Sequence, residues 1–248
     1  MTKELASLEL IEETEFNRAW CKILRKILEG GKLVTFKSNM GRVEVYDTVQ
    51  VIPLTGYALT QIHNVEVHPQ YPYSSTVSFS KEWSREFWEK KYLPLSKDQR
   101  PRYLAFDRLV NYPAGEGKSI DRLAWMRKSL SSQIAEEAAV NDCQAITWIP
   151  ETDLPSEVTP YIQRIWMRVY PNLTVDVHII WRATDAYNLW QSRVIAVANM
   201  LERELIRPNK CRTARIINYY DSLFIKKTNE AAAREVQSIA VNPRNVYE

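Results

Sequence analysis

The pattern of apolar and polar positions changes period within residues 174–190, TVDVHIIWRATDAYNLW. Up to Trp181 apolar and polar residues alternate, as in a strand that buries one face. Beyond Asp185 the apolar residues recur at helical spacing, at Ala186, Leu189, Trp190 and Val194. This segment therefore predicts a strand that ends near Trp181 and a long helix from about Asp185 to Leu205.

Amphipathic helices are also predicted elsewhere in the chain, over residues 12–31, 119–139 and 229–240, with a short aromatic helix over 81–92. The first carries Phe16, Trp20, Ile23, Leu24 and Ile27 on one face. Gly30-Gly31 predicts its end, because glycine adopts the left-handed cap conformation at little cost. The second helix is expected to begin at Ser119 as N-cap.

Strand-like segments alternate with these helices, at residues 32–52, 71–79, 144–149, 161–169, 174–181 and 214–225. The first contains the turn signature Ser38-Asn39-Met40-Gly41 and predicts a hairpin. No internal repeat, low-complexity tract or interdomain linker interrupts the chain. The fold class predicted is α+β, with residues 1–248 forming a single domain in which a mixed sheet carries packed helices.

Composition places the chain among folded proteins, with 45% hydrophobic and 25% charged residues. The net charge of +3 comes from dispersed residues, so no nucleic-acid partner is expected. Three separated cysteines predict neither disulfides nor a zinc ribbon and favour a reducing compartment. With no apolar signal core or membrane-length run, the expectation is a cytoplasmic protein without membrane association.

Generic catalytic motifs do not identify a site. The segment AGEGKS, residues 114–119, lacks the spacing of a phosphate-binding loop and is interpreted as a flexible loop. His63 and His68 are five residues apart, which places them on opposite faces of a strand and disfavours metal chelation. No metal site is therefore expected. For Arg182 and Asp185, a surface ion pair and a helix N-cap remain alternatives to ligand binding.

Four segments in sequence order, AITWIPETDL, TPYIQRIWMRV, IIWRATDAYNLW and INYYDSLFI, resemble the thymidylate synthase family, particularly its shorter archaeal-type members. The resemblance is best over residues 105–225 and weak over 1–100, although SNMGR lies where the family has a phosphate-binding arginine loop. It implies a thymidylate-synthase-like fold and a homodimer that associates through its sheet. In the family, a cysteine thiolate attacks deoxyuridylate, and methylenetetrahydrofolate supplies the one-carbon unit and hydride.

The chain departs from the family pattern at the position of the nucleophile. The family cysteine falls on Tyr161, whose phenol titrates near 10 and is a poor substitute for a thiolate. The two arginines that reach the partner's nucleotide fall on Asn141 and Asp142. Cys143 is interpreted as a small buried residue rather than a replacement nucleophile.

The contacts to the base and the sugar also differ. The asparagine that recognises the uracil edge falls on Arg193, which can donate hydrogen bonds but cannot accept them. The histidine and tyrosine that hold the ribose fall on Leu223 and Ile225, whose side chains are apolar.

Part of the family site remains. Arg182 aligns with a phosphate-binding arginine and Asp185 with the aspartate near the pterin ring, while Asn218 and Asp221 lie on the final strand near the nucleotide. Two hypotheses follow. One is a nucleotide- or nucleoside-binding relative that acts without cysteine, for example in one-carbon transfer with a reduced folate, with Tyr161 in the pocket. The other is an inactive homologue with a binding, regulatory or assembly role.

Overall fold

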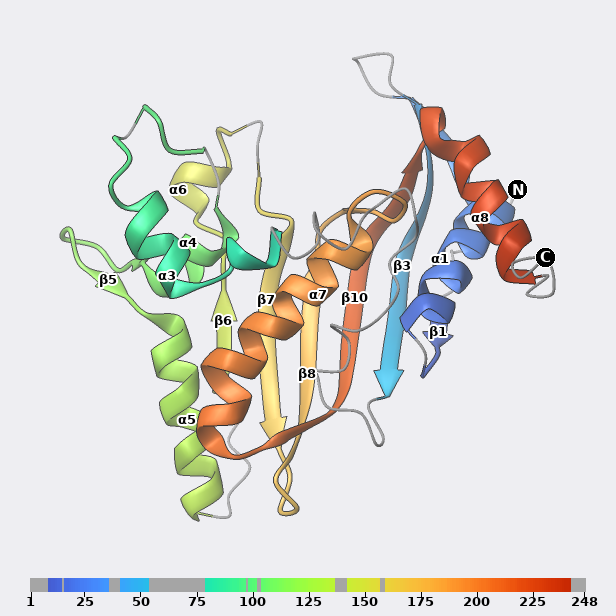
Figure 1. Cartoon of the computed structure of the whole chain (residues 1–248). Helices are drawn as coiled ribbons and strands as arrows, with labels where there is room; N and C mark the ends of the chain where they lie inside the picture. Colours follow the sequence, from blue (N-terminus) through green and yellow to red (C-terminus); the bar gives the residue numbers. More distant parts are fainter. Residues whose placement is uncertain are drawn as a thin grey trace, which may run out of the picture.

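A mixed β-sheet forms the centre of the molecule, and helices pack against it (Figure 1). The structure is a computed structural model that describes residues 9–14, 16–35, 41–53, 79–96, 98–101, 104–136, 142–156 and 159–241. The strand order is β1 (Glu9–Glu12), β3 (Gly41–Pro53), β10 (Arg212–Lys226), β8 (Thr174–Trp181), β7 (Ile162–Val169) and β6 (Gln144–Ile146). Two further strands extend it, β2 (Lys32–Thr35) beside β3 and β9 (Thr184–Asp185) beside β10.

The long strand β10 connects the two halves of the sheet. It runs parallel to β8 and β9 and antiparallel to β3. Antiparallel pairing then continues from β8 to β7 and from β7 to β6. The α+β class and the mixed sheet are therefore confirmed, and the described residues share one hydrophobic core.

Four helices supply most of the helical packing, α1 (Phe16–Gly30), α5 (Arg122–Glu136), α7 (Trp190–Leu201) and α8 (Glu230–Val241). Figure 1 shows α7 in front of the strands β7, β8 and β10, with α5 beside β6 and with α1 and α8 beside β3. The remaining elements are short: α3 (Arg85–Phe87), α4 (Ala105–Val110), α6 (Pro150–Asp153), the π-helical turns η2 (Trp88–Tyr92) and η3 (Glu202–Ile206), the 3-10 turns η4 (Arg207–Asn209) and η5 (Lys227–Asn229), and the hairpin β4 (Tyr112–Pro113) with β5 (Ser119–Ile120).

Helix α1 buries the apolar face that its spacing predicts, because all five of the predicted residues lie in the core. Its end has a different cause from the one expected. Gly31 has no left-handed backbone conformation, and a Cβ there would lie 2.3 Å from the carbonyl oxygen of Ile27 and 2.6 Å from Cγ1 of Val43. Glycine is required at this position because the chain passes so close to β3.

The two faces of the sheet differ in burial. On β8, the alternating residues Val175, Val177, Ile179 and Trp181 are all fully buried, as predicted. Their neighbours in register on β7 and β10 belong to the same face. On the opposite face Asp176 is buried, but most side chains are only half-buried. We call the half-buried set the open face: Val49, Val51, Arg164, Trp166, Arg168, His178, Ile180, Ile217 and Tyr219.

Several predicted boundaries are wrong. The long helix begins at Trp190 rather than Asp185, and Leu189 is its N-cap. Helix α5 begins at Arg122, where Asp121 Oδ1 accepts a hydrogen bond of 2.8 Å from Ala124 N, while Ser119 belongs to β5. The strand predicted at 144–149 ends at residue 146.

Other predictions fall on residues outside the described ranges: the hairpin turn at 38–40, most of the strand at 71–79, His63, His68 and Asn141. Strands β2 and β3 do pair antiparallel on either side of that turn, as the hairpin requires. Among the described residues, no helix combines the length and apolar character needed to cross a membrane.

Candidate functional site

The strand-to-helix junction after β8 brings several predicted site residues together. Strand β8 ends at Trp181, and the backbone N–H of Arg182 donates to the carbonyl of Tyr161 at 2.9 Å, which ties the junction to the start of β7. Asp185 then pairs with Phe224 of β10, so the chain makes a short strand before α7 begins. Tertiary pairing with β10 therefore delays the helix that local spacing predicts.

Tyr161 lies between two side chains at this junction. Its ring is nearly parallel to that of Trp181, with the centroids 6.3 Å apart and the planes at 6°. The guanidinium of Arg193 lies over the Tyr161 ring, with Cζ 3.9 Å from the ring centroid, which is a cation–π geometry. The ring of Trp83 makes a tilted contact with the Tyr161 ring at 6.4 Å. Tyr161 is thus a packing residue in this structure.

The protonation of Tyr161 agrees with its packing. Burial raises the pKa of the phenol to about 12, although the positive charge of Arg193 acts in the opposite direction. At neutral pH the phenol is therefore protonated, and a protonated phenol is a weak nucleophile.

Arg193 is anchored to the backbone of the junction. Its Nη1 donates to the carbonyl of Ala183 at 3.1 Å and to Oγ1 of Thr184 at 3.3 Å. The guanidinium is thus held in place by the junction backbone and by the Tyr161 ring.

Asp185 is buried and its carboxylate organises the turn before α7. Oδ1 accepts hydrogen bonds from the backbone N–H groups of Tyr187 at 3.2 Å and Asn188 at 3.0 Å. Oδ2 accepts from the Asn188 side-chain amide at 2.8 Å and lies 4.0 Å from Nζ of Lys226. Asp185 thus has a capping function for the turn, although it is not the N-cap of α7.

Asn218 lies in the core, on the covered face of β10. It accepts a hydrogen bond from Trp181 Nε1 at 2.9 Å and donates to Gln50 Oε1 at 3.3 Å. Tyr220 continues this polar row, since its hydroxyl accepts from Trp190 Nε1 at 2.7 Å and its ring stacks on Trp181 with centroids 6.1 Å apart. Asn218 thus satisfies an indole N–H that would otherwise be buried without an acceptor.

Arg182 and Asp221 are exposed, in contrast to the other predicted site residues. Partial burial and the nearby charge of Arg42 lower the pKa of Arg182, and Asp221 opposes this shift. Burial and the carboxylate of Asp47 raise the pKa of Asp221, while Arg182 lowers it. These side chains therefore form one electrostatic group, which the structure assembles from β3, from the residue that follows β8, and from β10.

The residues around Arg42 complete this charged group. Arg42 donates from Nε and Nη2 to the two carboxylate oxygens of Glu44, at 2.6 and 2.9 Å. Glu44 also accepts a hydrogen bond from the hydroxyl of Ser222, and the Arg42 guanidinium lies over the ring of Phe224 at 4.3 Å. The SNMGR segment points to Arg42, but sequence reasoning missed Glu44 and Ser222, since only strand pairing brings them together.

The residues at the other family positions are apolar and buried. Leu223 and Ile225 have no exposed surface and belong to the core. Cys143 is likewise fully buried, and desolvation raises the pKa of its thiol to about 12, so it is not a thiolate at neutral pH. Neither group offers polar chemistry to a ligand.

The tryptophans around the junction do not fit a folate ring. Trp83, Trp181 and Trp190 are buried, and their ring contacts are with Tyr161, Tyr220 and Phe16. A pterin stacked on an indole needs an accessible ring face. We therefore assign no step of chemistry to a folate at this junction.

Within the described ranges, no cluster of three or more histidine, cysteine or acidic side chains could hold a metal ion. A cavity does lie elsewhere, between residues 80–86 and 199–207, and none of the predicted site residues lines it. The junction is thus a packed structure with a charged group on its exposed side. No protein-family model matches the sequence, and neither does any curated protein.

Proposed function

We propose that this chain is a thymidylate-synthase-like protein that has lost the thiol-dependent reaction and acts as a binding or assembly protein, as a homodimer. The observation that carries the proposal is the position of Tyr161. Its ring occupies the place that the resemblance gives to the nucleophile, and it is held between Trp181 and Arg193.

The chemistry of the junction supports loss of the reaction. Addition to a pyrimidine C6 requires an accessible anionic nucleophile. Tyr161 is protonated and stacked, and Cys143 is buried with its pKa raised to about 12. An asparagine amide can both donate hydrogen bonds to a uracil edge and accept them from it, whereas Arg193 can only donate. Its Nη1 already donates to Ala183 and Thr184.

The open face of the sheet supports assembly. Its centre carries half-buried apolar side chains from β3, β8 and β10, namely Val49, Val51, Ile180 and Ile217. An apolar strip with a charged rim is typical of a protein interface. On the same face, Nε of Arg164 is buried and has no hydrogen-bond partner among the described residues. A partner acceptor would satisfy it.

Such an acceptor would come from a dimer in which the open faces of two subunits pack against each other. The two-fold axis would run parallel to the strands, above the boundary between β10 and β8. This rotation places β7 of one subunit over β3 of the other, since both lie equally far from the boundary. In the strand register, Arg164 of β7 pairs with Ile180 of β8, and Ile180 pairs with Tyr219 of β10. Tyr219 in turn pairs with Val49 of β3, so Arg164 and Val49 lie at the same height along the strands. Arg164 would thus lie level with the partner's Val49, two residues along β3 from the partner's Asp47, whose charge is opposite.

The catalytic part of the proposal is tested by incubation with deoxyuridylate tritiated at C5, with and without methylenetetrahydrofolate. No tritium release is expected, and melting temperatures should not change on addition of either compound. Tritium release above that of a no-protein control would overturn the loss of the reaction.

The assembly part is tested by light scattering after size-exclusion chromatography. A mass of twice the 29.0 kDa chain is expected. Ile217→Glu, at the centre of the open face, should yield a folded monomer, because a charge there opposes interface burial. Leu154→Glu, at an exposed apolar position in another part of the fold, is the matched control and should remain a dimer. A wild-type monomer at micromolar concentration rules out the dimer.

A second candidate function, binding of a nucleotide or nucleoside, is favoured by the charged group at Arg182. Arg182 is exposed, lies near Arg42, and makes a side-chain hydrogen bond to the carbonyl of Pro160 at 3.2 Å. A panel of nucleotides, nucleosides and folates in a thermal-shift experiment tests this function, with Arg182→Ala as the variant and exposed Arg212→Ala as the control. A shift that Arg182→Ala abolishes would support nucleotide binding, whereas no shift at millimolar concentration excludes it.

The proposed location of the protein is the cytoplasm. The three cysteines are free thiols, which supports the proposal of a reducing, cytoplasmic compartment. A reduced folate is proposed as a cofactor only for the second candidate function. It would bind at an exposed surface and would not stack on the buried tryptophans.

A further inference from the structure

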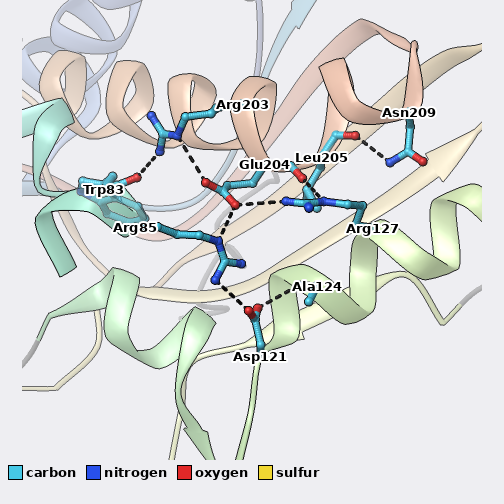
Figure 2. A network of polar contacts seen from close by, with 9 residues as sticks. All are labelled: Trp83, Arg85, Asp121, Ala124, Arg127, Arg203, Glu204, Leu205 and Asn209. Carbon is cyan, nitrogen blue, oxygen red and sulfur yellow. Dashed lines mark hydrogen bonds and ion pairs between the residues drawn. The ribbon is translucent and has the colours of Figure 1, made fainter. Parts of the chain in front are cut away.

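A cavity of about 520 Å³ lies between the segment around α3 and the end of α7 with η3. This volume falls within the range of small-molecule sites, roughly 300–1,000 Å³. Cationic side chains from both walls line it, namely Lys81, Arg85, Arg203 and Arg207. Figure 2 shows the polar network on one side of this cavity.

The centre of the network is the buried carboxylate of Glu204. Oε2 accepts hydrogen bonds from Arg85 Nε at 2.9 Å and from Arg127 Nη2 at 3.2 Å, and Oε1 accepts from Arg203 Nε at 3.3 Å. Arg85 also forms an ion pair with Asp121 at 2.8 Å (Figure 2). Three guanidinium groups therefore face two carboxylates, which leaves one excess positive charge.

The other charged residues of the cavity lining differ in how they are paired. Glu202 is balanced by Arg207, with 3.7 Å between their charged atoms. Glu86 is balanced by Lys90 at 3.0 Å, a lysine that is not part of the cavity lining. Lys81 is exposed and is paired with no carboxylate among the described residues. Over the lining as a whole, four cationic side chains face the three carboxylates of Glu86, Glu202 and Glu204, so the cavity carries one net positive charge.

A neutral polar group on the cavity wall also lacks a partner. Asn199 donates from Nδ2 to Ser80 Oγ at 3.2 Å, and its Oδ1 is buried without a hydrogen-bond partner. Turning the amide over would exchange the two atoms and leave the other one unsatisfied. Whichever way the amide is turned, one buried polar atom behind this wall has no hydrogen-bond partner among the described residues.

We infer that this cavity binds a small phosphate ester, with the phosphate near Lys81 and the arginines and the organic part in the remaining volume. Guanidinium and ammonium groups bind phosphate oxygens through charge-assisted hydrogen bonds. The volume leaves space for a sugar-sized group beyond the phosphate. The site is separate from the junction at Tyr161 and independent of the proposed function.

The binding experiment uses isothermal titration at low ionic strength with three probes: ribose 5-phosphate, inorganic phosphate and ribose. Ribose 5-phosphate is expected to bind more tightly than inorganic phosphate, and ribose is expected not to bind. Affinity should fall as salt is added, because the contact is ionic. Absence of heat from both phosphate probes at 10 mM, on the order of the weakest useful affinity, would overturn the inference.

Variants locate the binding in the cavity. Lys81→Gln and Arg207→Gln change exposed side chains and should each weaken ribose 5-phosphate binding by roughly fivefold or more, with melting temperatures close to that of the wild type. Lys90→Gln removes an exposed lysine of the same segment outside the cavity and should bind like the wild type. Equal affinity in all three variants would contradict the assignment.

Glu204→Gln distinguishes a ligand site from a purely structural clamp. Without the internal carboxylate, the three arginines have more positive charge available to a phosphate, so affinity should rise even though stability falls. A loss of stability with no gain in affinity would count against the inference. If the variant does not fold, the Lys81 and Arg207 variants still decide.

Discussion

The guanidinium of Arg193 lies over the ring of Tyr161, with Cζ 3.9 Å from the ring centroid. These two residues stand where the resemblance places a base-reading asparagine and a nucleophilic cysteine. In this chain they contact each other, and the pair closes the junction between β7, β8 and α7.

Tyr161→Ala should lower the free energy of unfolding by about 2–4 kcal/mol, because it removes a packed aromatic ring and leaves a cavity. Tyr161→Phe keeps the stack on Trp181 and the cation–π contact, so its cost should be about 1 kcal/mol or less. Urea unfolding followed by circular dichroism measures both. Equal losses in the two variants would show that the hydroxyl, and not the ring, is the important group.

Asp185→Ala should cost about 1–3 kcal/mol, since three donors of the turn lose their acceptor in a buried setting. Asp98→Ala, at an exposed loop position, is the control and should be neutral. Thermal unfolding provides the comparison. A neutral Asp185→Ala variant would mean that the turn does not depend on this carboxylate and would favour a ligand role.

Asn218→Leu should cost about 1–3 kcal/mol, because Trp181 Nε1 is then buried without an acceptor. The same substitution in a Trp181→Phe background should cost less, since the indole donor is absent there. A double-mutant cycle measures this coupling. Additive losses would indicate that the hydrogen bond contributes nothing.

Cys143 should resist alkylation in the folded protein. Burial raises the pKa of its thiol to about 12, so almost no thiolate exists at pH 8, whereas Cys21 and Cys211 are partly exposed. Iodoacetamide labelling followed by peptide mass spectrometry should detect slower modification of Cys143 than of the other two, with the difference lost in urea. Rapid labelling of native Cys143 would reopen the question of a second nucleophile.

Stability should fall on acidification because of His178. Burial lowers its pKa below the ordinary value of 6.5, and Arg164, Arg168 and Arg215 act in the same direction, against Asp176. Between the lowered pKa and 6.5, the unfolded chain binds more protons than the folded protein. The contribution is therefore complete above pH 6.5 and is lost as pH falls towards the folded pKa.

Denaturant unfolding of the wild type and of His178→Gln across pH 5–8 tests this sign. The variant should show a weaker dependence on pH in this range. An identical profile in the two proteins would assign the acid sensitivity to other groups.

The alternation of β8 and the spacing of α1 could be read from the sequence because each element has one face in the core. Val175, Val177, Ile179 and Trp181 are all buried, as their period predicts. The predicted start of the helix at Asp185 is wrong because the start of this helix does not depend on local periodicity. Its start depends on the pairing of Asp185 with Phe224, which lies on a strand formed much later in the chain.

The α+β class and the main helices and strands follow from the sequence alone, as do several of the residues that meet at the junction. The roles of these residues depend on the tertiary structure. Stacking on Trp181 and the approach of Arg193 make Tyr161 a packing residue, and burial makes Asp185 and Asn218 acceptors for nearby N–H groups. The physical reason is that hydrogen-bond partners and burial come from contacts between distant segments, whereas periodicity reports only which face of an element is buried.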